Sequence, residues 1–397
     1  MIVGGGQAGI EAAMSLRGGG YQEPIRLLTG EAFAPYQRPP LSKDVLLGRR
    51  SLDRLGFVGP EFYEKNGIAL HISCWVDAIE RPQRRVVLRN GERHAYDHLV
   101  LATGAQARRL SRMPAGVTCL RTLDDAAILA KALDEVDRLI VVGGGFIGLE
   151  VAASAHQRGK SVTVLEKAGR LMERVASPAM AQYFLDLHRN NGVAVRLGVE
   201  LDEWVRSGSR LDGMKLATGE LVPARLAVVG IGVNVDGTLA ASAGLEFDDG
   251  ILVDAQMRTS DPCVYAIGDC ARHYNRHAGA VIRLESVQNA VDQAQVAAAN
   301  IMGKERHYDS VPWFWTDQYG AKLQIAGFPA ASSLPVLRGD PATGGFSVFH
   351  FAGGGLVAAE SVNRPADHMA ARRILARQSR LAPEQAADPS FDLRKMA

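Results

Sequence analysis

Short apolar runs alternate with helical patterns over the first three quarters of the chain. Two of these runs, Met1–Val3 and Leu139–Val142, each end in a glycine-rich turn, and a helical pattern follows each turn. Short runs that are apolar throughout are typical of strands buried in a parallel sheet. The pattern therefore predicts an α/β protein with two units of strand, turn and helix.

The same reasoning places the other elements of these two units. Further strands are predicted at Ile25–Glu31, Leu70–Val76, Val86–Leu88, Leu99–Ala102, Ser161–Glu166, Val193–Gly198 and Leu226–Gly232, and through Ser260–Cys270. Helices are predicted at Gly9–Leu16, Thr122–Val136, Pro178–Asn191 and Ser286–Asn300.

The pattern changes from Pro312 onward. Alternating segments predict an antiparallel sheet, with Ala352–Gly355 turning its last hairpin. The expected strands are Leu323–Phe328, Phe346–Phe351 and Leu356–Val362. A helix is predicted at His368–Arg377, and the tail after Leu381 is expected to be loose.

The glycine spacing after each of the two apolar runs indicates a dinucleotide site. The glycines are Gly4, Gly6 and Gly9 in the first turn, and Gly143, Gly145 and Gly148 in the second. The first glycine of such a turn allows a sharp bend, the second lets the backbone approach a pyrophosphate, and the third lets helix and strand pack closely. The positive end of the following helix then faces the phosphates.

A carboxylate follows each turn at the distance that ribose recognition requires. Glu31 and Glu166 lie about 20 residues beyond the last glycine of their turns, each at the end of a predicted strand. Glycine-rich turns can also simply join a strand to a helix, but the recurrence of every part of the pattern favours two dinucleotide sites. A carboxylate at Glu166 also favours NADH over NADPH, with Lys167 and Arg174 the residues to suspect if the preference is reversed.

Composition excludes several other classes of protein. A chain of 397 residues with 47% hydrophobic and 22% charged residues suits two or three globular domains. No apolar run approaches the roughly 20 residues of a membrane span, and no signal peptide opens the sequence. The net charge of +2 gives no reason to expect nucleic-acid or membrane binding. A cytoplasmic protein is expected.

The cysteines predict neither a metal site nor a dithiol. Cys74, Cys119, Cys263 and Cys270 include no pair with CxxC spacing, so four reduced thiols are expected. No cysteine lies between Met1 and Ser73.

Two further polar positions have alternative interpretations. The prolines within Pro35–Lys43 predict a rigid, extended segment that could hold the Lys43 ammonium over a ring system, or else a surface turn with a solvated lysine. Asp269, at the end of an apolar strand, could bind a ribityl or ribose hydroxyl, cap a helix that follows it, or do both.

The sequence resembles the NADH-dependent, FAD-containing ferredoxin reductases of bacterial oxygenase systems. The matching segments are Gly4–Gly9, Pro39–Lys43, Leu101–Gly104, Arg121–Leu123, Gly143–Glu150, Ser260–Cys270, Glu285–Val287 and Pro312–Trp315. The resemblance implies a glutathione-reductase-like fold with two Rossmann-type domains and a C-terminal α+β domain. The implied domains are a discontinuous FAD-binding domain (residues 1–105 and 235–310), an inserted NADH-binding domain (106–234) and a C-terminal domain covering the flavin (311–397).

The resemblance also assigns roles to individual residues. Lys43 and Glu150 would form an ion pair beside the flavin, and Trp315 would lie near the flavin on the partner side. The residues implied to contact FAD are Ala8, Glu31, Lys43, Val76, Arg121, Asp269 and Val287, and those implied to hold NADH are Gly145, Ile147, Gly148 and Glu166.

The cysteine pattern indicates where the electrons go. Disulfide reductases of this fold carry two cysteines beside the flavin and peroxide-reducing relatives carry one, whereas this chain has none in that region. Electrons are therefore expected to leave the flavin singly, to a 2Fe-2S ferredoxin that feeds a haem monooxygenase. Such ferredoxins are usually acidic, so a basic docking face is expected. The candidates are Arg49, Arg50, Arg54, Arg283, Arg372 and Arg373, of which the cluster of Arg49, Arg50 and Arg54 could instead simply be a solvated face.

Two other functions are compatible with the sequence. One is a rubredoxin reductase, or the NADH-oxidising component of a different redox chain. The other is a non-catalytic flavoprotein similar to apoptosis-inducing factor, in which an NADH-induced change of shape is a signal; no long basic or disordered extension supports it.

Overall fold

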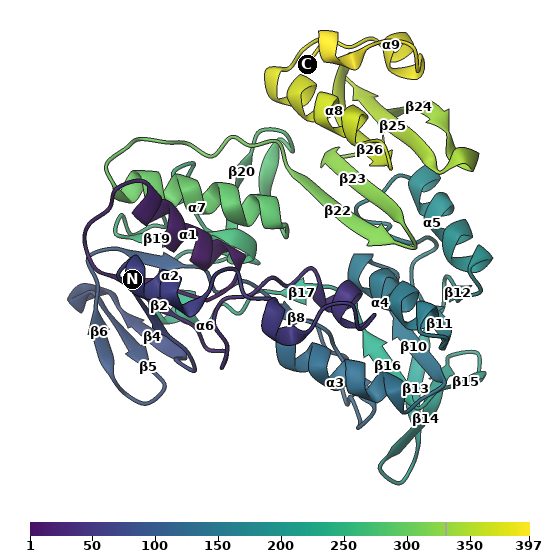
Figure 1. Ribbon diagram of the computed structural model, residues 1–397, viewed down its shortest axis with the longest axis horizontal. Coiled ribbons are helices and arrows are strands. Elements are labelled where there is room, and N and C mark those ends of the chain that lie inside the picture. Colours follow the sequence, from purple (N-terminus) through teal and green to yellow (C-terminus); the bar gives the residue numbers. More distant parts are fainter. Residues whose placement is uncertain (330–331) are drawn as a thin grey trace. The chain divides into compact units, whose positions relative to one another are not determined.

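The computed structural model of the protein describes residues 1–329 and 332–397, and Figure 1 shows the order of its helices and strands. The chain forms two compact units, each assembled from three separate segments. Unit 1 comprises residues 1–37, 55–106 and 234–314, and unit 2 comprises residues 38–54, 107–233 and 315–397. The predicted α/β class is confirmed.

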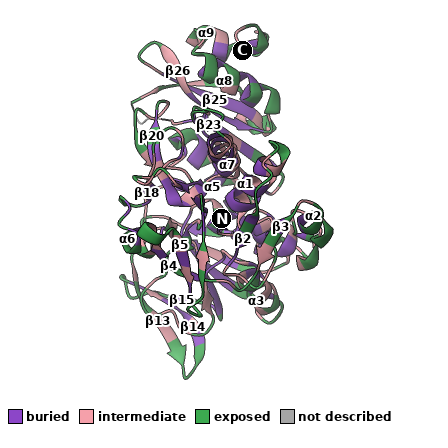
Figure 2. Ribbon diagram, turned by 90° about the vertical axis from the view of Figure 1, so that its left-hand side faces the viewer, coloured by how far each residue is buried: buried purple, intermediate pink, exposed green. Residues whose placement is uncertain are grey.

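Unit 1 is built on a five-stranded parallel sheet in the order β19-β7-β1-β2-β3. Its strands are β1 (Ile2–Val3), β2 (Ile25–Leu28), β3 (Ile68–His71), β7 (Leu99–Leu101) and β19 (Val264–Ala266). Helices α1 (Gln7–Gly18) and α7 (Val287–Ile301) pack against each other and share one apolar core with this sheet. Figure 2 shows both helices largely in the colour of buried residues.

Smaller elements complete unit 1. The short helices are α2 (Pro60–Lys65) and α6 (Thr238–Ser242). One small antiparallel sheet contains β4 (Val76–Glu80), β5 (Arg85–Leu88) and β6 (Arg93–Ala95), and another sheet contains β18 (Ile251–Leu252), β20 (Ala271–Asn275) and β21 (Ala280–Arg283).

Unit 2 repeats the same connection of strand, turn and helix. Its parallel sheet has the order β12-β11-β10-β16-β9, with β9 (Val117–Thr118), β10 (Arg138–Val142), β11 (Ser161–Leu165), β12 (Ala194–Arg196) and β16 (Leu226–Val229). The helices are α3 (Leu123–Asp134), α4 (Phe146–Gln157) and α5 (Pro178–Asn190). In both units the strand before the glycine turn lies between two parallel neighbours, and the strand after the helix is one of them.

Antiparallel sheets make up the rest of unit 2. A hairpin sheet contains β13 (Leu201–Ser207), β14 (Arg210–Leu216) and β15 (Leu221–Pro223), and its tip is exposed (Figure 2). The C-terminal sheet has the order β22-β23-β26-β25-β24, with β22 (Trp313–Gln318), β23 (Ala321–Gly327), β24 (Leu334–Asp340), β25 (Gly345–Ala352) and β26 (Gly355–Val362). Helices α8 (Pro365–Arg377) and α9 (Pro383–Ala387) follow.

The remaining strands, β8 (Gln106–Ala107) and β17 (Val233–Asn234), pair where the chain passes from one unit to the other. In the part of the chain that the structure describes, no helix combines the length and the apolar character that crossing a bilayer would require.

Two predictions of local structure in the first 80 residues are wrong. The predicted strand Leu70–Val76 is broken, because Ser73 adopts a φ of 55°, and a bend separates β3 from β4. The segment after Pro39 is not extended: Leu41–Val45 forms a turn of π-helix, and Pro40 already has helical dihedral angles. Proline is compatible with the start of a helix because the first N–H groups have no intrahelical partner.

The tail after Leu381 is ordered rather than loose. Leu381, Ala386 and Leu393 are buried against the C-terminal sheet. Arg338 on β24, itself nearly buried, donates to the carbonyls of Ala386, Asp388, Pro389 and Phe391. The guanidinium therefore holds the tail in place through main-chain atoms, which a sequence pattern does not reveal.

Candidate functional site

In the glycine turn of unit 1, the second glycine has free space for a side chain, whereas the first and third do not. A Cβ on Gly4, whose φ is +116°, would lie 2.1 Å from the Ala102 carbonyl oxygen. A Cβ on Gly9 would lie 1.9 Å from the Gly4 oxygen, whereas one on Gly6 would meet nothing within 4 Å. Gly4 and Gly9 are therefore required by packing, and Gly6 opens onto free space at the start of α1.

The turn of unit 2 has the same geometry. A Cβ on Gly143 (φ +105°) would lie 2.4 Å from the Gly230 oxygen, and one on Gly148 would lie 2.2 Å from the Gly143 oxygen. A Cβ on Gly145 would meet nothing within 4 Å. The two turns therefore present equivalent open faces.

Both helices begin without a side-chain cap. Gly6 is the N-cap of α1 and Gly145 that of α4, and neither helix start is capped by a side-chain hydrogen bond. The first N–H groups of a helix need an acceptor from elsewhere, and a pyrophosphate is one that fits an open glycine face. Ala8 and Ile147 occupy equivalent second positions of these helices, Ala8 buried and Ile147 45% exposed.

The two predicted ribose carboxylates are held in different ways. Glu166 accepts from the backbone N–H groups of Gly144 at 2.5 Å and of Ala168 at 2.7 Å, so it is fixed beside the second glycine turn. Glu31 accepts from the Tyr36 hydroxyl at 2.5 Å. Lys167 and Arg174 are exposed.

Three other predicted flavin contacts belong to unit 1. Asp269 lies in a 3₁₀ turn (Gly268–Cys270) after β19, and a Cβ on Gly268 would lie 2.9 Å from the Ala8 Cβ. The buried Gln293 of α7 accepts from the Gly268 N–H at 2.7 Å. This arrangement brings the loop of Asp269 against the start of α1 and the middle of α7, and Val287 is the first residue of α7.

Val76 is buried at the start of β4. The expectation that Asp269 could cap a following helix is wrong, because strand β20 follows it and Ser286 caps α7.

Lys43 and Glu150 meet in unit 2. The Lys43 ammonium lies 3.0 Å from Glu150 Oε1, and the two side chains are 19% and 3% exposed. Glu150 also accepts from the Ser42 hydroxyl at 2.5 Å and from the Thr316 hydroxyl at 2.7 Å. One buried carboxylate is therefore stabilised by a cation and two hydroxyl donors, as a buried charge requires.

Ser42 and Thr316 were missed as functional positions. Ser42 lies inside the Pro39–Lys43 motif, and Thr316 directly follows the Pro312–Trp315 motif, so one belonged to a recognised signal and the other was adjacent to one. The π-helical turn of Leu41–Val45 allows Ser42 and Lys43, which are neighbours in sequence, to reach the same carboxylate. An extended segment would have placed them on opposite sides.

Arg121 and Trp315 also belong to unit 2. The Arg121 N–H donates to Asp125 in the capping box of α3, and its carbonyl accepts from Arg38 at 2.7 Å. Trp315 is partly buried on β22, next to Thr316. Unit 2 therefore contains Lys43, Arg121, Glu150 and Trp315 together with the second glycine turn, and unit 1 contains the remaining predicted flavin contacts.

The cysteines form no disulfide in the described structure. All four are free, and Cys119 and Cys270 are buried. Burial raises the pKa of the Cys119 thiol and that of the Cys270 thiol, which disfavours the nucleophilic thiolate. Among residues 1–329 and 332–397 no group of three or more His, Cys, Asp or Glu side chains could hold a metal ion.

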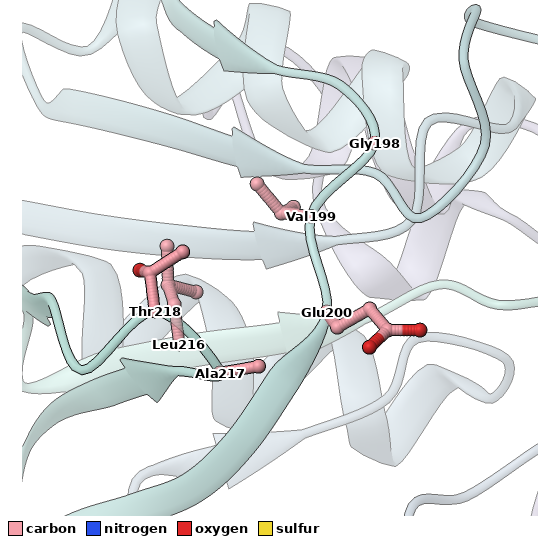
Figure 3. A pocket seen from close by; sticks show the side chains of 6 residues that line it. All are labelled: Gly198, Val199, Glu200, Leu216, Ala217 and Thr218. Carbon is pink, nitrogen blue, oxygen red and sulfur yellow. The ribbon is translucent and has the colours of Figure 1, made fainter.

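An open hollow in unit 2 is unrelated to these positions. It is lined by Gly198, Val199, Glu200, Leu216, Ala217 and Thr218 (Figure 3). None of the predicted site residues lines it, and its polar side chains are one hydroxyl and one exposed carboxylate. The nucleotide turns, rather than this hollow, define the candidate site.

The chain belongs to the pyridine nucleotide–disulphide oxidoreductase family, which its residues 1–297 match. Residues 313–397 match the family described as reductase C-terminal. The protein is accordingly an oxidoreductase that uses a flavin and a nicotinamide nucleotide.

Its relatives narrow the class further. Rhodocoxin reductase of Rhodococcus erythropolis is 45% identical over 398 residues, which cover 99% of this chain and 93% of that protein. The crystal structure of the ferredoxin reductase for the CYP199A2 system of Rhodopseudomonas palustris has a TM-score of 0.96 at 43% identity and covers 100% and 99% of the two chains. The crystal structure of the covalent complex of putidaredoxin reductase with putidaredoxin has a TM-score of 0.95 at 36% identity, and the match covers 100% of this chain and 97% of that chain. The resemblance inferred from the sequence motifs is confirmed.

Proposed function

We propose that the protein is an NADH-dependent ferredoxin reductase that contains FAD and delivers electrons singly to a 2Fe-2S ferredoxin serving a haem monooxygenase. The observation that carries the proposal is that unit 2 combines the second nucleotide turn with the buried Lys43–Glu150 pair, in a chain whose cysteines are all unpaired. The names of its relatives, a ferredoxin reductase among them, support the choice of partner.

In this proposal unit 1 binds most of the FAD. The open face at Gly6 and the start of α1 receive the pyrophosphate, Glu31 accepts the adenosine ribose hydroxyls, and Asp269 binds the ribityl chain. Ala8, Val76 and Val287 line the same site. The extents of the FAD-binding, NADH-binding and C-terminal domains expected from the sequence form part of the proposal.

NADH is bound by unit 2. Gly145 and the start of α4 receive the pyrophosphate, while Ile147 and Gly148 line the turn. Glu166 accepts hydrogen bonds from the ribose hydroxyls and would repel a 2′-phosphate, which accounts for a preference for NADH over NADPH.

A bound flavin supplies the ability to accept a hydride and to release electrons one at a time. The residues of this chain supply the electrostatics: the Lys43 ammonium provides positive charge where negative charge develops, and Glu150 fixes its position. Arg121 and Trp315 are assigned to the same region by the sequence motifs.

The docking surface for the ferredoxin is proposed to be basic. Arg49, Arg54 and Arg373 are exposed and suited to that role. Arg283 is not, because its side chain is only 8% exposed and forms ion pairs with Asp249 and Glu285. A cytoplasmic location also belongs to the proposal, since free thiols persist in reducing compartments.

The decisive experiment is acceptor discrimination by the purified, FAD-reconstituted protein. With NADH as donor, we expect a 2Fe-2S ferredoxin to be reduced faster than a rubredoxin, and the rate to fall as salt rises. Faster reduction of rubredoxin would establish the alternative function. A protein that remains colourless after incubation with FAD would refute both, and slow reoxidation by every acceptor would indicate a signalling flavoprotein.

A further inference from the structure

A row of hydrogen-bonded side chains in unit 2 leads from a buried histidine to the Lys43–Glu150 pair. His188 Nε2 lies 2.8 Å from Gln318 Oε1, and Gln318 Nε2 lies 3.1 Å from Thr316 Oγ1. Thr316 donates to Glu150 Oε1 at 2.7 Å, the same oxygen that Lys43 contacts. His188 and Thr316 are 0% exposed, Gln318 is 1% and Glu150 3% exposed.

Three elements bring these side chains together. Thr316 and Gln318 are two residues apart on β22, so their side chains share one face of the strand. His188 lies in the last turn of α5, and Glu150 in α4. Strand β22 therefore supplies two polar side chains that link His188 on α5 to the Glu150 carboxylate on α4.

The negative charge of Glu150 fixes the direction of every bond in the row. An ionised carboxylate can only accept, so the Thr316 proton must point to Glu150. The Thr316 oxygen is then free only to accept, and Gln318 must present its NH₂ group to it. The Gln318 carbonyl therefore faces His188, and His188 must donate through Nε2.

We propose that Thr316, Gln318 and His188 are positioning residues that orient Glu150 and, through it, Lys43, with His188 held as the neutral tautomer protonated at Nε2. The effect on hydride transfer rests on the proposed function of the Lys43–Glu150 pair. The order of donors and acceptors is independent of that function, because it follows from the negative charge of the Glu150 carboxylate alone.

The surroundings of His188 agree with this tautomer. Its Nδ1 is buried and has no hydrogen-bond partner among the described residues, which suits a bare nitrogen better than an N–H. Burial lowers the pKa of His188, so the ring is neutral at neutral pH. The rings of Tyr319 and His188 pack edge to face, with their centroids 5.3 Å apart.

The first test reads the tautomer directly. Nitrogen NMR of the FAD-reconstituted protein, labelled at histidine and assigned with His188→Gln, should show His188 protonated at Nε2 and unprotonated at Nδ1. A ring protonated at Nδ1 alone would overturn the proposal, because Gln318 would then turn its carbonyl to Thr316 and draw the hydroxyl away from Glu150. A doubly protonated ring at neutral pH would overturn the neutral tautomer, although Nε2 would still donate to Gln318.

The second test asks whether the Thr316 hydroxyl matters. Thr316→Val should slow flavin reduction by saturating NADH roughly tenfold in rapid mixing, and Thr316→Ser should restore most of the rate. Thr118→Val, on β9 of the same unit, is the matched control, because its hydroxyl only bonds a neighbouring carbonyl. Equal rates for the valine and serine variants would contradict a positioning role.

A third variant covers the case in which Thr316→Val does not fold. Gln318→Leu keeps the Thr316 hydroxyl but removes the NH₂ group that donates to it, and should slow flavin reduction by NADH roughly threefold. An unchanged rate would count against the proposal. Failure of the proposed function is recognised separately. If substitution of Lys43 left NADH oxidation unchanged, the pair would have no catalytic role, whereas the His188 tautomer is measured without NADH.

Discussion

Replacing Lys43 by methionine most directly tests the ion pair between the partly exposed Lys43 and the buried Glu150. Lys43→Met keeps the side-chain stem but removes the charge that lies 3.0 Å from Glu150 Oε1. At an effective dielectric constant of about 20, charges at that separation attract by about 5 kcal/mol. Lys43 is 19% exposed, so water screens part of this attraction. Glu150 would keep its two hydroxyl donors, and we expect a net loss in the free energy of unfolding of about 3 kcal/mol.

The expected effect on the reaction is larger. Removing one preorganised donor from a site where negative charge develops typically slows the chemical step by about 100-fold or more. Rapid mixing of the FAD-reconstituted variant with saturating NADH should therefore show flavin reduction slowed by about 100-fold. Denaturant titration of the same sample measures the stability change.

The control variants distinguish the effect of losing the Lys43 charge from the effect of a less stable fold. Lys131→Met removes an exposed lysine on α3 of the same unit and should change neither quantity. Adding Glu150→Leu to Lys43→Met should recover stability, because no unpaired charge remains buried, but should not recover the rate. If Lys43→Met unfolded like the wild type and accepted hydride at the same rate, the electrostatic argument would be refuted.

Three further predictions concern the nucleotide turn and the core. Glu166→Gln should weaken NADH binding roughly tenfold and narrow the discrimination against NADPH, measured as the ratio of kcat/KM values; an unchanged ratio would contradict the ribose assignment. Gly148→Ala should unfold the protein at a lower temperature, because its Cβ would lie 2.2 Å from the Gly143 oxygen, whereas Gly145→Ala should melt normally but lose NADH affinity. Burial lowers the pKa of His273 from 6.5 to about 4, so the unfolded chain binds a proton between these pH values that the folded chain does not. Unfolding free energy should therefore fall by about 3 kcal/mol as pH drops from 6.5 to 4, and fall less in His273→Gln.

Much of the architecture was predictable from the sequence because its signals are local. The glycine turns, the start of α3 at Thr122 and the Ala352–Gly355 hairpin turn each depend on a few adjacent residues. The pairing of Lys43 with Glu150 came from a resemblance and not from spacing, since more than a hundred residues separate them.

The errors arose where tertiary contacts decide the outcome. Nothing in the alternation of residues 70–76 signals that Ser73 takes a left-handed conformation. Strand β24 was not predicted at all, and it carries Arg338, whose bonds to main-chain carbonyls order the tail. Thr316 was missed because a hydroxyl at the end of an aromatic motif has no pattern of its own until the fold brings Glu150 to it.

The free thiols, two of which are buried, have a consequence for how such a protein responds to alkylating reagents and oxidants. A reductase that relays electrons through a cysteine pair is silenced by alkylating reagents and by oxidants that cap the sulfur. Here Cys119 and Cys270 are buried, Cys119 within an apolar core, and none of the assigned positions is a cysteine. Electron transfer by this protein should accordingly persist after treatment with iodoacetamide or mild peroxide. It would then remain active under conditions that inactivate reductases that depend on a cysteine pair.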